Sequence, residues 1–118
     1  MNHIVHRLTI VGLFLAAVTL ADAQEAKRIT ILYDAFGAPS ALRKDWGFAS
    51  LVEYGGKRIL FDTGNNAGIF EHNVGQLGID LTRLDAVVIS HRHGDHTSGL
   101  SYLLGVNSNE CVRFHRHI

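Results

Sequence analysis

Four residues that could bind a metal ion lie within six positions, in the segment from Ser90 to Gly99. They are His91, His93, Asp95 and His96. Imidazole nitrogen and carboxylate oxygen together favour zinc, with iron or manganese as alternatives, over calcium or magnesium. His91 and His93 are two residues apart, so in an extended segment they point the same way and could hold one ion. Asp95 and His96 follow at a turn and could face a second ion.

A second motif, Asp62-Thr63-Gly64, lies about 30 residues earlier. The motif could be half of a homodimeric aspartic protease, in which two chains share a proton between two carboxylates. It could also be a turn in which the carboxylate accepts hydrogen bonds from backbone amides. In a third interpretation, Asp62 accepts hydrogen bonds from the loop of His91 to His96 and fixes its shape, as carboxylates that orient metal-binding histidines do.

Three strands and a helix are expected before the histidine cluster, and a fourth strand leads directly into it. The strands are predicted at 28–34, 50–54, 57–61 and 85–90, and the helix at 66–77, where apolar residues recur at spacings of three and four. Gly55 and Gly56 suit a tight hairpin between the second and third strands. A short helix is expected from Leu100. This order predicts an α/β (α+β) fold with a mixed sheet and helices on one face.

The composition is that of a folded chain with no overall charge. Of the 118 residues, 47% are hydrophobic and 19% charged, and eleven Lys and Arg balance eleven Asp and Glu. A neutral chain offers no broad basic field, so we expect no nucleic-acid partner. Cys111 is the single cysteine, which excludes an intramolecular disulfide.

The first 23 residues have the order of a signal peptide. Arg7 precedes an apolar run from Leu8 to Leu20, and Ala21-Asp22-Ala23 fits a signal-peptidase site. A membrane span needs about 20 apolar residues, so the run is too short for a stable membrane anchor. We expect cleavage after Ala23 and a periplasmic or secreted protein.

The two motifs together resemble those of the metallo-β-lactamase (MBL) fold superfamily. Three segments, Asp45-Trp46-Gly47-Phe48, 51–64 and 90–104, together resemble in particular the dihydropterin-methyl-ribofuranosyl-aminobenzene phosphate synthase-like branch. The resemblance covers residues 29–106 and implies an αββα sandwich of two similar halves with one or two metal ions. In that family His91 and His93 would share the first ion with a later histidine. Asp95 and His96 would share the second ion with another later histidine, and a later aspartate would bridge the two ions.

The resemblance also implies a chemistry. A metal-bound hydroxide would attack a carbonyl or phosphoryl centre, and Asp95 would be catalytic by orienting that nucleophile or carrying its proton. The substrate would be a small molecule, such as a phosphorylated compound, a lactam or an ester.

The sequence departs from the family pattern after the histidine cluster. Only 22 residues follow His96, and none is an aspartate. Residues 24–106 are therefore predicted to form the N-terminal half of the domain, and residues 107–118 an atypical tail from truncation or a frameshift. Such a chain is expected to have low or no activity alone, and its uncovered sheet invites self-association. No role is assigned to Cys111, His115 or His117. The alternatives are a non-catalytic metal-binding module and the aspartic protease-like dimer.

Overall fold

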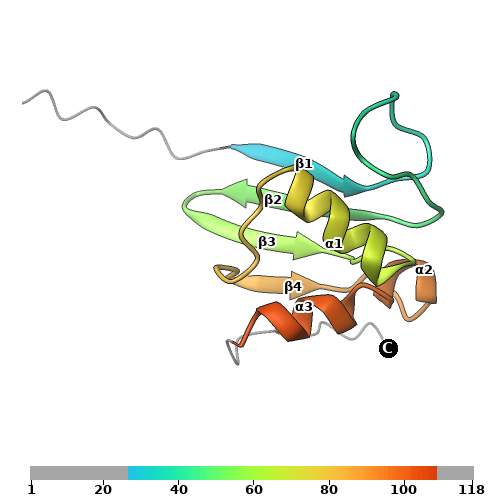
Figure 1. The fold of residues 1–118 in the computed structure, drawn as a ribbon. Helices are drawn as coiled ribbons and strands as arrows, with labels where there is room; N and C mark the ends of the chain where they lie inside the picture. Colours follow the sequence, from blue (N-terminus) through green and yellow to red (C-terminus); the bar gives the residue numbers. More distant parts are fainter. Residues whose placement is uncertain (1–26, 109–118) are drawn as a thin grey trace, which may run out of the picture.

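The computed structural model describes residues 27–108, which form one sheet and three helices (Figure 1). The segment predicted to be a signal peptide (1–23) and the residues Cys111, His115 and His117 lie outside the described residues. None of the helices in the described part has both the length and the apolar character that crossing a bilayer requires. In chain order the elements are β1 (Arg28–Tyr33), β2 (Ala49–Tyr54), β3 (Lys57–Phe61), α1 (Ala67–Gln76), β4 (Ala86–Val88), α2 (Gly94–Thr97) and α3 (Leu100–Val106).

The sheet is mixed, with the strand order β1-β2-β3-β4. β1, β2 and β3 pair antiparallel, and the β2–β3 hairpin turns at Gly55 and Gly56, whose φ angles are 57° and 70°. β4 pairs parallel with β3 through the partners Phe61 and Val88. Because parallel strands end at the same sheet edge, the residues after β3 lie beside the residues after β4. This pairing brings the two sequence motifs together.

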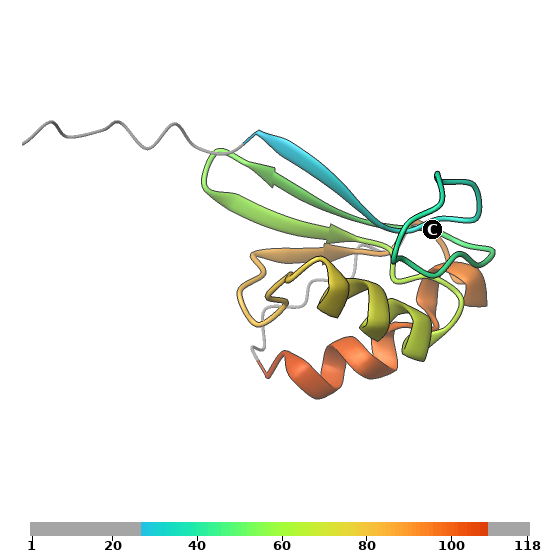
Figure 2. The same ribbon diagram turned by 45° about the horizontal axis from the view of Figure 1, so that its top comes forward.

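Helices α1 and α3 cover the same face of the sheet, as Figure 2 shows. Their side chains meet those of the strands in a fully buried core: Leu32, Leu51, Leu60, Phe70, Val74, Val87 and Leu103, each no more than 3% exposed. Burial of one such side chain contributes about 1.5–3 kcal/mol to folding. The predicted mixed sheet with helices on one face is therefore confirmed.

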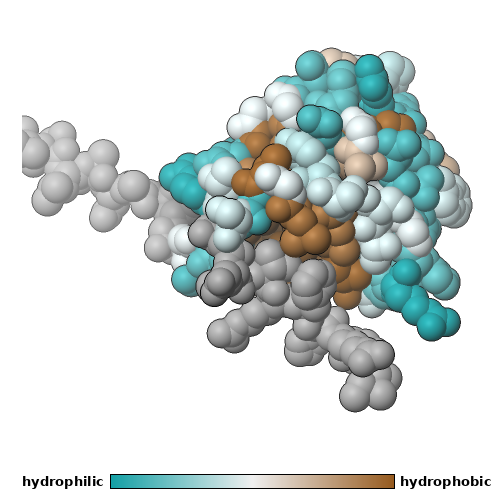
Figure 3. All heavy atoms as spheres, turned by 60° about the horizontal axis from the view of Figure 1, so that its bottom comes forward, coloured by the Kyte–Doolittle hydropathy of each residue, from teal (hydrophilic) through white to brown (hydrophobic). Residues whose placement is uncertain are grey.

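The opposite face of the sheet carries apolar side chains that these helices do not cover. Ile29 and Ile31 are 67% and 41% exposed, and Val52 and Ile59 are half-buried. The surface on the side of α3 and β4 also shows a patch of hydrophobic residues (Figure 3).

The local elements agree closely with the sequence pattern, with two differences. The predicted helix 66–77 corresponds to α1 with its caps, since the Asn66 side chain accepts a hydrogen bond from Ile69 N and Leu77 is the C-cap. The predicted strand 85–90 is wrong in length, because only Ala86–Val88 pairs with β3. The second difference is α2, a single helical turn inside the histidine cluster, where the sequence predicts a simple turn.

Candidate metal centre

Asp62 is the first residue after β3 and lies at the sheet edge where β4 also ends. Its backbone is left-handed, with φ 56°, a conformation that Asp and Asn tolerate better than most residues. Its amide donates to the carbonyl oxygen of Val88 over 2.9 Å, which extends the β3–β4 pairing by one bond. The side chain is 1% exposed and therefore points into the protein.

Both carboxylate oxygens of Asp62 accept hydrogen bonds from the histidine segment. Oδ1 accepts from the amide of Ser90, and Oδ2 accepts from the Ser90 hydroxyl, each over 2.7 Å. Oδ2 also lies 2.7 Å from Nδ1 of His96. This geometry agrees with the third interpretation, in which Asp62 holds the loop in shape. It does not support the aspartic protease interpretation, because a buried carboxylate with both oxygens engaged cannot meet a second chain.

Three of the four candidate ligands converge on one point. One ligand atom each of His91, Asp95 and His96 lies within 4.8 Å of the others. His96 Nε2 is 3.4 Å from Asp95 Oδ2, and the His91 and His96 rings have centroids 4.1 Å apart. Asp95 and His96 are half-buried and His91 is exposed, so the group is open to solvent on one side.

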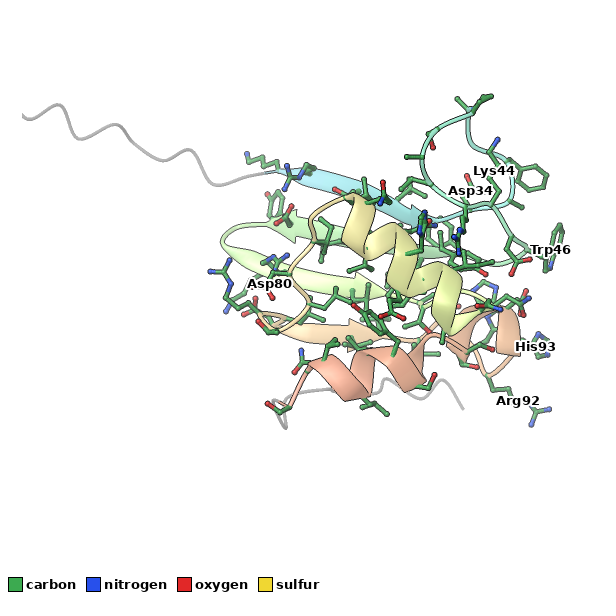
Figure 4. All side chains as sticks on the ribbon, in the orientation of Figure 1. Asp34, Lys44, Trp46, Asp80, Arg92 and His93 are labelled. Atoms are coloured by element: carbon green, nitrogen blue, oxygen red, sulfur yellow. The ribbon has the colours of Figure 1, made fainter. Side chains whose placement is uncertain are left out.

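His93 lies beside this group but is not part of it. Its ring meets the ring of His91 edge to face, with centroids 4.8 Å apart. His93 is the extended N-cap of α2, and the helical turn that follows places Asp95 and His96 on the inner side. Figure 4 shows His93 and its neighbour Arg92 projecting outward at this end of the molecule. The structure therefore brings together His91, Asp95 and His96, and leaves His93 at the rim.

The donor set of the three converging residues fits zinc or iron. Two imidazoles and a carboxylate are ligands that both metals accept. Because Asp62 occupies Nδ1 of His96, Nε2 is the nitrogen that remains for an ion. A carboxylate behind a histidine in this way is the common arrangement at metal sites, where it fixes the tautomer and raises ligand basicity.

The loop between β1 and β2 supports the group from the other side. The carbonyl oxygen of Asp95 accepts from the Phe48 amide over 3.3 Å. A β-carbon placed on Gly47, whose φ is 126°, would lie 2.2 Å from that same oxygen. Thr63 donates to the His96 carbonyl through its amide, over 2.9 Å, and through its hydroxyl, over 3.0 Å. The main chain of α2 is thus held by two segments distant in sequence.

A buried asparagine fixes this loop to the core. The Asn73 amide group donates to the carbonyls of Leu32 and Arg43, each over 2.9 Å, and its oxygen accepts from the Arg43 amide over 2.8 Å. Asn73 is 1% exposed. Asn73 is not among the residues predicted from the sequence, although a signal is present there. Asn73 falls three residues after Phe70, on the apolar stripe of α1, where a polar side chain needs buried partners.

A second anchor joins the loop to β1. The Tyr33 hydroxyl donates to Asp45 Oδ2 over 2.5 Å, and the Asn65 side chain donates to the same oxygen over 3.2 Å. These hydrogen bonds, that of Tyr33 first, lower the pKa of Asp45 below its ordinary value. Burial, together with the neighbouring Asp45 carboxylate, raises the pKa of Tyr33 well above its ordinary value.

Comparison with known proteins agrees with the motifs. The family model described as Metallo-beta-lactamase superfamily matches residues 45–110. A 7,8-dihydropterin-6-methyl-4-(beta-D-ribofuranosyl)-aminobenzene-5'-phosphate synthase from Methanocaldococcus jannaschii is 32% identical over 87 residues, which are 70% of this chain and 30% of the relative. Ribonuclease Z from Brevibacillus brevis is 34% identical over 80 residues, 68% of this chain and 24% of the enzyme.

Among solved structures, human tRNase Z, short form, aligns with a TM-score of 0.49 and 29% identity, over 64% of this chain and 27% of that chain. The chain thus spans between about a quarter and a third of the length of these relatives.

Proposed function

The chain belongs to the metallo-beta-lactamase superfamily, and we propose that His91, Asp95 and His96 hold a zinc ion for the hydrolysis of a small-molecule substrate. One observation carries this proposal. One ligand atom from each of the three side chains lies within 4.8 Å of the other two. The buried carboxylate of Asp62 already forms a hydrogen bond with one of them, His96. When bound, zinc supplies Lewis acidity and lowers the pKa of water toward neutrality.

Each residue of the site has a distinct role in this proposal. His91 and His96 offer neutral nitrogens to the ion, and Asp62 keeps the His96 ring in the orientation that leaves Nε2 available. The Ser90 hydroxyl, 2.9 Å from Nδ1 of His91, does the same for that ring. Asp95 orients the attacking water and accepts its proton on a carboxylate oxygen. His93, whose ring contacts that of His91, is a further candidate ligand for the same ion or for a second one.

The substrate is proposed to be a small phosphorylated compound, or else a lactam or ester. The Methanocaldococcus relative is a synthase of a phosphorylated compound, which supports the phosphorylated substrate. The balance of eleven basic and eleven acidic residues provides no broad field for RNA, although one relative is a ribonuclease. Iron or manganese in place of zinc would leave the roles of the residues unchanged.

Metal analysis of the full chain tests the ligand assignment. We expect at least one zinc per chain in the parent protein. The His91→Ala variant should lose most of one equivalent of zinc. The control variant, His72→Gln, removes an imidazole from α1 outside the site and should keep its zinc. His93→Ala should lose less than His91→Ala, because His93 lies outside the converging group. Equal zinc content in the parent and His91→Ala would contradict the assignment.

Turnover measurements separate hydrolysis from metal binding alone. Zinc-loaded protein is assayed with bis(p-nitrophenyl) phosphate, nitrocefin and a single-stranded RNA, with Asp95→Asn as the variant. Hydrolysis of a small substrate that a chelator abolishes and Asp95→Asn reduces by about 10²-fold or more supports the proposal. Bound zinc with no turnover would favour a metal-binding module instead, and cleavage of RNA alone would overturn the substrate class.

A further inference from the structure

A small hollow opens directly beside the metal group. Its volume is about 140 Å³, and the residues that line it include the aromatic Phe36, Trp46 and Phe48 together with Asp95 and His96. Two of the three converging ligands therefore also line this hollow. Figure 4 shows Trp46 and His93 at the same end of the molecule.

Two of these aromatic rings are unusually exposed. Phe36 is 81% and Trp46 65% exposed, and the two rings meet edge to face with centroids 6.3 Å apart at 75°. Large apolar rings left in water gain free energy when a ligand covers them. Loops positioned by a rigid scaffold carry a disproportionate share of binding residues, and adjoining exposed apolar side chains often mark an interaction site.

The loop that carries these rings is held in place before any ligand arrives. The hydrogen bonds of Asn73 to Arg43 and of Tyr33 to Asp45 fix its second half. At the start of the loop, the Phe36 amide donates to the Asp34 carboxylate over 3.0 Å, which orders the turn that carries Phe36. A prepositioned binding surface loses little conformational freedom when it binds, so the contact energy is retained as affinity.

We propose that Phe36 and Trp46 bind a planar aromatic ring of the substrate and so place its reacting group over His91, Asp95 and His96. This inference rests on the proposed function and specifies its substrate class. Pockets that enclose whole ligands measure about 300–1,000 Å³, so a hollow of this size takes one ring system and not the entire molecule. The remainder of the substrate reaches the adjoining metal group.

A cationic ligand could also bind aromatic faces, but this position disfavours one. An ammonium group in the hollow would lie next to the zinc ion that Asp95 and His96 hold in the proposed function, and the like charges would repel each other. The Asp95 carboxylate, which could otherwise attract the cation, is engaged by that ion. A neutral ring linked to an anionic or polar reacting group suits both parts of the surface.

Trp46 is the chain's single tryptophan, so its fluorescence reports directly on this hollow. We would titrate the zinc-loaded full chain with phenyl phosphate and with cyclohexyl phosphate, which has a ring of similar size but not planar. Affinities are measured by tryptophan fluorescence and by calorimetry. Phenyl phosphate is expected to bind about three- to tenfold more tightly than cyclohexyl phosphate. Phe36→Ala should remove most of this preference.

Two further variants keep the test specific. Phe36→Leu retains an apolar side chain without an aromatic ring, and it should also lose the preference. Tyr54→Ala removes an aromatic ring that is 64% exposed at the far end of β2, and it should leave the preference unchanged. Equal affinities for the two phosphates, or a preference that survives Phe36→Ala, would overturn the proposal.

Failure of the proposed function is distinguishable from failure of this inference. If the protein takes up no zinc, the proposed function fails, and the neutral pair benzyl alcohol and cyclohexylmethanol then tests the hollow without an ion. A preference for benzyl alcohol that Phe36→Ala removes would sustain the aromatic site. If zinc binds and neither aromatic compound is preferred, the inference fails while the metal site stands.

Discussion

The carboxylate of Asp62 lies 2.7 Å from Nδ1 of His96, across 34 residues of sequence. The same carboxylate also accepts from the amide and hydroxyl of Ser90, so one buried side chain joins the end of β4 to the helical turn that carries Asp95 and His96. The left-handed backbone of Asp62 aims the carboxylate inward from the end of β3. This residue therefore acts on the candidate metal group through its ligands, without being one of them.

Asp62→Asn is expected to weaken zinc binding about 10- to 100-fold, the usual effect of losing a carboxylate behind a ligating histidine. Asparagine tolerates the left-handed conformation, so the backbone is preserved, but its amide cannot accept three hydrogen bonds as the carboxylate does. Affinity is measured by competition with a chromogenic chelator. Asp85→Asn, at the other end of the sheet, is the control and should bind zinc as the parent does. An unchanged affinity in Asp62→Asn would mean that His96 is oriented by other groups.

Gly47→Ala is expected to destabilise the protein by more than about 1 kcal/mol, because an alanine is strained at a φ of 126° and its β-carbon would collide with the Asp95 carbonyl. Zinc affinity should fall as well, since the collision displaces the turn that carries Asp95 and His96. Gly37→Ala, in the same loop, meets nothing within 4 Å and should change stability by no more than about 0.5 kcal/mol. Urea unfolding and zinc titration give the two readouts. Equal stability of the two variants would show that the loop is free to move away from α2.

The hydrogen bond between Tyr33 and Asp45 is expected to stabilise the fold between two pH limits. The pKa of Asp45 in the folded protein is lowered from its ordinary value of 3.8. The ionised carboxylate therefore stabilises the fold above pH 3.8, and this stabilisation is lost as the pH falls through the pKa of the folded protein. The pKa of Tyr33 in the folded protein is raised from its ordinary value of 10.0. The protonated hydroxyl therefore stabilises the fold below pH 10.0, and this stabilisation is lost as the pH rises toward and through the pKa of the folded protein. Tyr33→Phe should therefore be less stable than the parent near neutral pH, and the difference should narrow at both extremes.

Urea unfolding midpoints of the parent and Tyr33→Phe, measured from acid to alkaline pH, check this expectation. Tyr54→Phe, which removes an exposed hydroxyl at the far end of β2, serves as the matched control and should show no such window. A constant difference between Tyr33→Phe and the parent at every pH would mean that the stabilisation does not depend on the ionisation of Asp45 or Tyr33, and would contradict this account.

Local elements were predictable because their signals lie within a few residues of one another. The spacing of Phe70, Val74 and Leu77 predicted α1, and Gly55-Gly56 predicted the hairpin, since both depend on backbone geometry over one or two turns. The run from Asp85 to Ser90 is longer than β4 because apolar residues continue past the last residue that pairs with β3. Burial pattern alone does not distinguish a paired residue from its buried neighbour.

The sequence by itself determined which metal ligands are available, because side-chain types and short spacings are local properties. The two imidazoles of His91 and His96 and the carboxylate of Asp95 suit zinc or iron. Only the tertiary structure decided that these three converge while His93 remains at the rim, since that depends on the single turn of α2. It also decided the role of Asp62 among three open interpretations. The parallel pairing of β3 and β4 sets Asp62 beside Ser90 and His96, and contacts between residues 28 and 34 positions apart depend on the packing of the whole chain.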